Sequence, residues 1–136
     1  MSVLINQLYG RGRPRPLHPV GVTRDATWLV HSDPETPVGV PIIDDAGSRP
    51  CVLRHSRAIG LPAGAPDIEG LAVHLPGPGG GDLLFAGTGD SPLGRHVLVP
   101  RVAEGSCSTL IPMRTTTGPI LLRMTPATTL VAGSRR

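Results

Sequence analysis

The stretch that decides the fold is CVLRHSRAIGLPAGAPDIEGLAVHLPGPGGGDLLFA, residues 51–86. It contains three short apolar runs separated by two connections rich in Pro and Gly. The runs are 51–56, 70–75 and 82–86, and the connections are 60–67 and 76–81. Short apolar runs bounded by turn residues are typical of β-strands, and a short Gly-rich connection favours a hairpin. The stretch therefore predicts antiparallel strands, with the last two runs paired.

Side chains along each predicted strand alternate between two faces. In residues 51–56, one face carries Val52, Arg54 and Ser56, and the other carries Cys51, Leu53 and His55. In residues 70–75, Leu71, Val73 and Leu75 share a face. Because Arg54 and Ser56 leave the same face, one pocket could use both, and an Arg guanidinium suits a carboxylate or phosphate.

A further alternating pattern precedes this stretch. One parity carries Val20, Val22, Ala26, Trp28 and Val30, with Arg24 as the exception, and the other carries Thr23, Asp25 and Thr27. This period of two predicts a half-buried strand from about residue 20 to residue 30.

The rest of the chain predicts shorter elements. We expect a short helix at 3–9 and a basic arm at 11–16. We expect an edge strand at 38–43, because Pro41 has no N–H to donate to a neighbouring strand. Further strands are expected at 96–100, 120–124 and 128–132. We expect turns at 32–37, 44–50 and 87–95. The fold class is all-β and mainly antiparallel, as a sheet, sandwich or barrel. We expect an N-terminal arm over 1–16 and a single domain over 17–136.

Composition narrows the function classes. The chain has 136 residues and a net charge of +3, and it contains one Trp, one Tyr and one Phe, so aliphatic side chains must build the core. Every basic residue other than histidine is Arg, which together with abundant Ala, Gly and Pro is typical of a GC-rich bacterial genome. Several of the arginines lie at the two ends, and stacking aromatics are scarce, so we expect no specific nucleic-acid binding.

Targeting and metal-binding signals are also weak. The N-terminal segment lacks the pattern of a signal peptide and no apolar run reaches membrane-spanning length, so we expect a cytoplasmic protein without a membrane partner. Cys51 and Cys107 lack zinc-type spacing, and we expect Cys51 to be a buried free thiol. The five histidines form no compact metal motif, so we assign no metal ligands.

Other site motifs favour a structural interpretation. The Gly-rich segments 76–82 and 87–94 lack the Lys of a phosphate-binding loop, and hairpin turns explain them better. No nucleophile elbow supports a Ser-His-Asp triad. We expect Asp67 to cap the 60–67 loop through backbone amides.

Four segments in order resemble the haem catalase barrel. They are Arg15-Pro-Leu-His18-Pro-Val-Gly21, Leu53-Arg54-His55-Ser56, Asp67-Ile-Glu-Gly70-Leu-Ala72-Val73 and Asp82-Leu83-Leu84. Order and approximate spacing agree from residue 15 to about residue 100. The resemblance implies a catalase-like β-barrel, here incomplete, with haem as cofactor and peroxidase or catalase activity, which is an oxidoreductase function.

The resemblance also implies individual roles. His18 would be the distal acid–base, Ser56 would hydrogen-bond it, and Arg15 and Arg54 would hold the haem propionates. The family's distal Asn is Ala86 in this chain, and its proximal Tyr has no counterpart, because the single tyrosine is Tyr9. Haem iron needs an axial ligand, so this departure bears directly on activity.

Two alternatives stay open. A degenerate, non-enzymatic barrel would keep the polar pocket for structure alone. Short bacterial relatives of this barrel carry a phosphodiesterase label, which a metal-dependent hydrolase would justify. The partner would be haem or another carboxylate-bearing ligand, and a half-formed barrel could pair its edges in a homo-oligomer.

Overall fold

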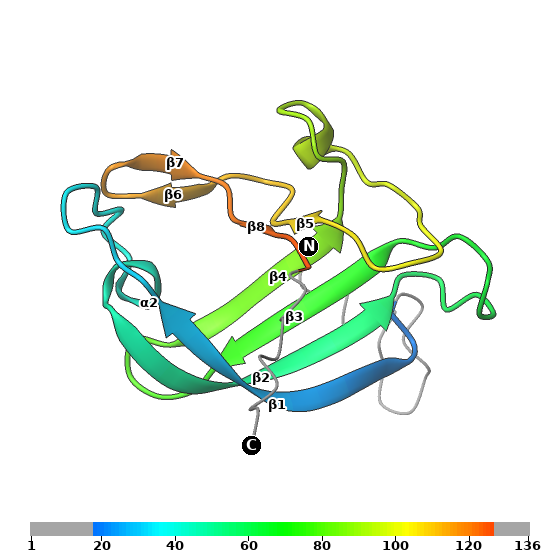
Figure 1. Cartoon of the computed structure of the whole chain (residues 1–136), viewed down its shortest axis with the longest axis horizontal. Coiled ribbons are helices and arrows are strands. Elements are labelled where there is room, and N and C mark those ends of the chain that lie inside the picture. The colour runs from blue at the N-terminus through cyan, green and yellow to red at the C-terminus, as the bar shows by residue number, and fades with distance from the viewer. Residues whose placement is uncertain (1–17, 127–136) are drawn as a thin grey trace, which may run out of the picture.

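The computed structural model describes residues 18–126, and these residues form a curled, mainly antiparallel β-sheet (Figure 1). The sheet has six strands in the order β1-β2-β3-β4-β5-β8, and β6 and β7 form a separate hairpin. The strands are β1 (Gly21–Val30), β2 (Gly47–Arg57), β3 (Glu69–Leu75), β4 (Gly81–Gly87), β5 (Cys107–Ser108), β6 (Met113–Thr115), β7 (Gly118–Ile120) and β8 (Arg123–Met124). The predicted all-β class is confirmed, and the sheet has the form of an incomplete barrel.

The register of β1 to β4 decides which residues share a face. Gly21 pairs with Ser56, Ser56 with Gly70, and Gly70 with Ala86. Directly opposed residues point to the same side of a sheet, so these four residues lie in one row on the same face. We call it the outer face, because the buried apolar side chains of β3 and β4 point to the opposite, inner face.

The core lies on the inner face. Its buried members are Ile42, Cys51, Val73, Leu75, Leu83, Phe85 and Cys107. In β4 the alternation is sharp, because Leu83 and Phe85 are 6% and 4% exposed while Leu84 between them is 68% exposed. The period of two predicted for residues 70–75 and 82–86 is confirmed, and so is the prediction that Cys51 is a buried free thiol.

The first strand follows its predicted alternation only in its second half. Ala26, Trp28 and Val30 are half-buried, whereas Val22 is 55% exposed and Arg24 is exposed. β1 is the last strand of the sheet on its side (Figure 1), and its second half packs against the core through Ala26 and Trp28.

The prediction of a strand at 38–43 is wrong, because the segment contains the short helix α2 (Pro41–Asp44). Pro41 stands at the start of the helix, where its fixed φ is favourable and its missing N–H costs nothing. The Asp44 carboxylate accepts hydrogen bonds from the N–H groups of Val38, Gly39 and Val40. The indole N–H of Trp28 donates to Ile42 O at 2.7 Å and ties the helix to β1.

The boundaries around this helix and the strand predicted at 96–100 also need correction. β2 begins at Gly47, within the predicted turn 44–50. Residues 96–100 form no strand. The chain turns through the 3-10 helix η1 (Gly94–His96) and then makes only isolated contacts. Val99 N–H donates to Gly87 O, at the end of β4, at 2.9 Å, and an isolated bridge joins Arg101 to Asp67, just before β3.

At the C-terminal side, the predicted strand 120–124 is split between the ends of β7 and β8. The predicted helix at 3–9, the arm at 1–16 and the strand at 128–132 lie outside the described residues. Within residues 18–126, neither helical segment has the length and apolar character that crossing a membrane requires.

The buried aromatic ring of β4 gives a direct test of this packing. We expect Phe85→Ala to lower the free energy of unfolding by about 3–5 kcal/mol, because it leaves a cavity in the core. Leu84→Ala, at the exposed neighbouring position, should change it by less than about 0.5 kcal/mol. Urea unfolding of both variants measures their free energies of unfolding. An equal loss of free energy in the two variants would contradict the placement of Phe85 on the inner face and Leu84 on the outer face.

Candidate functional site

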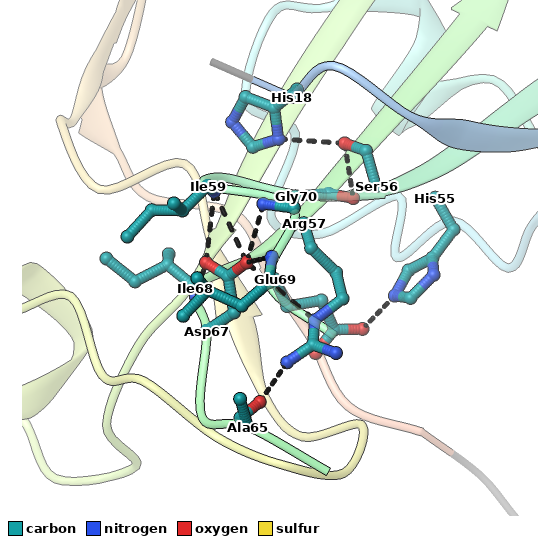
Figure 2. A network of polar contacts seen from close by, with 12 residues as sticks. His18, His55, Ser56, Arg57, Ile59, Ala65, Asp67, Ile68, Glu69 and Gly70 are labelled. Carbon is teal, nitrogen blue, oxygen red and sulfur yellow. Dashed lines mark hydrogen bonds and ion pairs between the residues drawn. The ribbon is translucent and has the colours of Figure 1, made fainter. Parts of the chain in front are cut away.

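His18 and Ser56 meet on the outer face. Their side chains form a hydrogen bond between His18 Nδ1 and Ser56 Oγ at 2.8 Å, although 38 positions separate them in the chain (Figure 2). Ser56 lies near the end of β2 and is 6% exposed, while His18 precedes β1 and is half-buried. The structure thus brings together the acid–base residue and the orienting hydroxyl that the resemblance implied.

The backbone fixes the position of His18. Its φ of 53° lies in the left-handed region, which is uncommon for a residue other than glycine. Its N–H donates to Ala58 O at 2.8 Å. Unusual backbone geometry of this kind persists only where surrounding contacts enforce it, and it is found more often at functional sites.

Gly70 makes room for the imidazole ring. A Cβ on Gly70 would overlap His18 Cε1, and it would stand 2.7 Å from His18 Nδ1 and 3.0 Å from Ser56 Oγ. The ring therefore lies directly against the backbone of β3. Sequence reasoning missed this role, although Gly70 could have been found by pairing the ends of the two predicted strands.

The hydrogen bonds of Ser56 favour one tautomer of His18. The Ser56 hydroxyl also lies 3.4 Å from Gly70 O, which can only accept. If the hydroxyl donates to Gly70 O, Nδ1–H of His18 donates to Ser56 Oγ, and Nε2 carries the free lone pair. His18 is then ready to accept a proton at Nε2.

Arg54 holds the backbone of His18. Its Nη2 donates to His18 O at 3.0 Å. The guanidinium is packed against the start of β1, where a Cβ on Gly21 would stand 2.8 Å from Arg54 Cζ. Since a guanidinium carries five N–H donors, Arg54 has further donors to offer a ligand.

Burial lowers the pKa of His18 below its usual value, and the positive charge of Arg54 lowers it further, while Asp67 acts in the opposite direction. Both main causes disfavour the charged ring. His18 is therefore neutral at pH 7, as a general base must be.

Asp67 organises the loop beside His18. Its carboxylate is 3% exposed and accepts hydrogen bonds from the N–H groups of Ile59, Gly60, Leu61 and Ile68, at 2.7–3.3 Å (Figure 2). The predicted capping role of Asp67 is confirmed. The loop in turn contacts the segment that carries His18, because a Cβ on Gly60 would stand 2.8 Å from Pro19 Cγ.

Burial alone would raise the pKa of Asp67, but the four backbone N–H donors outweigh it and hold the pKa below its usual value. Arg57 adds a cation, with its Nε 3.9 Å from the carboxylate. The negative charge of Asp67 is thus part of the folded structure.

Small and apolar residues continue the outer face beside His18. Ala72 pairs with Leu84, and Ala86 pairs with Gly70. Ala72 and Ala86 are half-buried and Leu84 is largely exposed. A flat apolar ligand could lie on this surface with His18 and Arg54 at one end.

Two predicted features differ in outcome. Arg15 lies outside the described residues. Ala86, which the resemblance aligned with a distal Asn, lies on the outer face opposite Gly70 and in the same row as Ser56.

Comparison of the chain with known proteins found no matching family model, no similar curated protein and no similar solved structure.

The contact between His18 and Gly70 can be tested by adding one methyl group. Gly70→Ala should displace the ring from Ser56 into solvent, so the pKa of His18 should rise toward its ordinary value of about 6.5. An NMR titration of the His18 ring protons measures this change. Gly81→Ala is the matched control, because its Cβ would meet nothing within 4 Å. An unchanged His18 pKa in Gly70→Ala would contradict the contact.

Asp67 should make the stability of the fold depend on pH. Its folded-state pKa is lowered, so its stabilisation is present above the unfolded-state pKa of about 3.9 and is lost as pH falls through the folded-state pKa. We expect Asp67→Asn to lower the free energy of unfolding by about 1–3 kcal/mol at pH 7, with a smaller difference at pH 3.

Urea unfolding of wild type and variant at the two pH values measures this difference. Asp25→Asn is the control, because Asp25 is exposed on β1 and should change stability by less than about 0.5 kcal/mol. A difference between wild type and Asp67→Asn that stays constant from pH 7 to pH 3 would rule out the ionic role.

Proposed function

We propose that the outer face binds haem and that His18 serves as the acid–base in peroxide chemistry, in the manner of the haem catalases that the sequence resembles. The observation that carries the proposal is the pairing of His18 Nδ1 with Ser56 Oγ at 2.8 Å over Gly70. When the Ser56 hydroxyl donates to Gly70 O, it accepts from Nδ1–H of His18, and Nε2 is left for proton transfer.

The residues present fit one side of a haem. The surface of Ala72, Leu84 and Ala86 is apolar, as the face of a macrocycle requires. Arg54, at the edge of this surface, suits a propionate carboxylate, because a guanidinium can form two parallel hydrogen bonds to it. Arg15 would be the second propionate ligand, as the resemblance implies.

When bound, haem would supply the electrons needed to cleave the O–O bond. His18 would accept a proton from peroxide at Nε2, and Ser56 would hold the ring in place while it does so. His18 would then return this proton to the departing oxygen. Its lowered pKa supports the first half of this cycle, because the ring is neutral before peroxide arrives.

The haem catalases that the sequence resembles use a tyrosine as the axial ligand of the iron. Residues 18–126 contain no tyrosine, and Tyr9 lies outside the described residues. If the bound iron lacked a protein ligand, the protein would bind haem without efficient turnover; in the degenerate-barrel alternative, by contrast, the polar pocket serves the structure alone.

The phosphodiesterase alternative has less support. Among residues 18–126, no group of three or more His, Cys, Asp or Glu side chains is arranged to hold a metal ion. A metal-dependent hydrolase centre would need such a cluster.

Titration with hemin tests the proposal. We expect a shift of the Soret band on binding to the wild-type protein, and weaker hemin binding by Arg54→Ala. We expect His18→Gln to bind hemin within about twofold of wild type while peroxide turnover falls by about 100-fold. Ser56→Ala should lower turnover less, because it leaves the base in place.

His31→Gln and Ser48→Ala serve as controls, because both residues lie outside the proposed site and Ser48 is exposed on the same strand as Ser56. Absence of a Soret shift with folded wild-type protein would overturn the haem proposal. Loss of stability in Arg54→Ala with an unchanged hemin response would assign Arg54 to the scaffold alone.

A further inference from the structure

The inner face carries a second polar pair, His55 and Glu69, on the side of the sheet opposite His18 and Ser56. β2 and β3 direct Ser56 and Gly70 outward and the neighbouring His55 and Glu69 inward. His55 Nε2 lies 2.8 Å from Glu69 Oε1, and the His55 ring points away from His18 (Figure 2). None of the roles proposed for the outer face uses this pair.

This pair lines a hollow of about 340 Å³ inside the curl of the sheet. Its walls are largely apolar, with Val22, Leu53, Leu71, Met124 and Pro126 among the lining residues. A concave, mainly apolar hollow of this size with a few polar groups is typical of a small-molecule site.

Two nitrogen-bearing side chains on neighbouring strands, those of Arg24 and His55, line the hollow. Val22 pairs with His55, and Arg24 pairs with Leu53, so Arg24 and His55 stand at diagonal positions on adjacent strands of the inner face. A long side chain reaches its diagonal neighbour. Among residues 18–126, neither the Arg24 guanidinium nor the Nδ1 of His55 has a hydrogen-bond or ion-pair partner.

The acidic groups of the hollow are placed differently. Glu69 already accepts from His55 through one oxygen and from Gly105 N–H, at 3.1 Å, through the other. Glu104 is exposed to solvent. Arg24, which is exposed like Glu104, is the single arginine among the described residues that line the hollow, and it is the group there that attracts an anion.

Cys107, at the wall of the hollow, does not supply a nucleophile. Burial raises the pKa of its thiol to about 12, and the charge of Glu69 and its hydrogen bond add to this effect. The thiol stays protonated at pH 7, and the protonated form is unreactive. Cys107 therefore offers no thiolate to the hollow at pH 7.

We propose that the inner hollow binds an amphipathic carboxylic acid, with its carboxylate held by Arg24 and its hydrocarbon part packed against Leu53, Leu71 and Met124. The Arg24 guanidinium can form two hydrogen bonds to the carboxylate. This site is separate from the proposed haem site, since the two lie on opposite faces of the sheet.

Calorimetric titration of the full chain with decanoate tests the proposal, with decanol and decylamine as matched probes. We expect decanoate to bind, and both matched probes to bind at least about tenfold more weakly. Arg24→Gln should weaken decanoate binding by about tenfold or more, because it removes the charge and keeps a polar side chain. Arg114→Gln, an exposed arginine on β6 away from the hollow, should leave it unchanged.

A blocking variant checks that the ligand occupies the hollow. Leu71→Trp adds volume at the wall and should abolish decanoate binding, while circular dichroism shows whether the strands remain. Equal binding of decanol and decanoate, stronger binding of decylamine, or no binding at all would overturn the proposal. A hemin-binding measurement on Arg24→Gln separates the two sites, because it should match wild type whether or not the outer site proves to bind haem.

Discussion

The pairing of β2 with β3 is the constraint on which both faces of the molecule depend. With Ser56 opposite Gly70, the hydroxyl and the bare backbone of the glycine lie side by side, and the His18 ring fits over them. The same register turns His55 and Glu69 to the inner face and places the apolar side chains of β3 in the core. A slip by one residue would exchange the two faces, so the core and the polar groups enforce the same register.

The central strands and their faces could be predicted because they follow local rules. The alternation in residues 70–75 and 82–86, the hairpin between them and the capping role of Asp67 each depend on residues close together in the chain. The turn chemistry of Gly and Asp and the period of two were sufficient for these elements.

Other features depend on partners that the local pattern does not reveal. Helix α2 forms in a segment with strand-like composition, because Asp44 binds the free amides before it and Trp28, 14 residues earlier, binds a carbonyl within it. The ring of His18 reaches a residue 38 positions away. The family resemblance suggested the pair of His18 and Ser56. The role of Gly70 beneath the His18 ring, and the pair of His55 and Glu69, became visible only from the strand register and the side-chain contacts.

The position of β1 at the end of the sheet has a consequence for self-association. Within residues 18–126 only β2 pairs with β1, and none of these residues pairs with the opposite backbone edge of the strand. Unpaired edges of this length invite aggregation, and charged side chains are a common protection. Arg24 and Asp25 are consecutive near the middle of β1, and their side chains point to opposite faces of the sheet. A strand added at this edge would therefore have a charged neighbour on each face of the sheet. Arg24 thus stands both at the wall of the hollow and on the edge strand, where a charged side chain disfavours indiscriminate pairing.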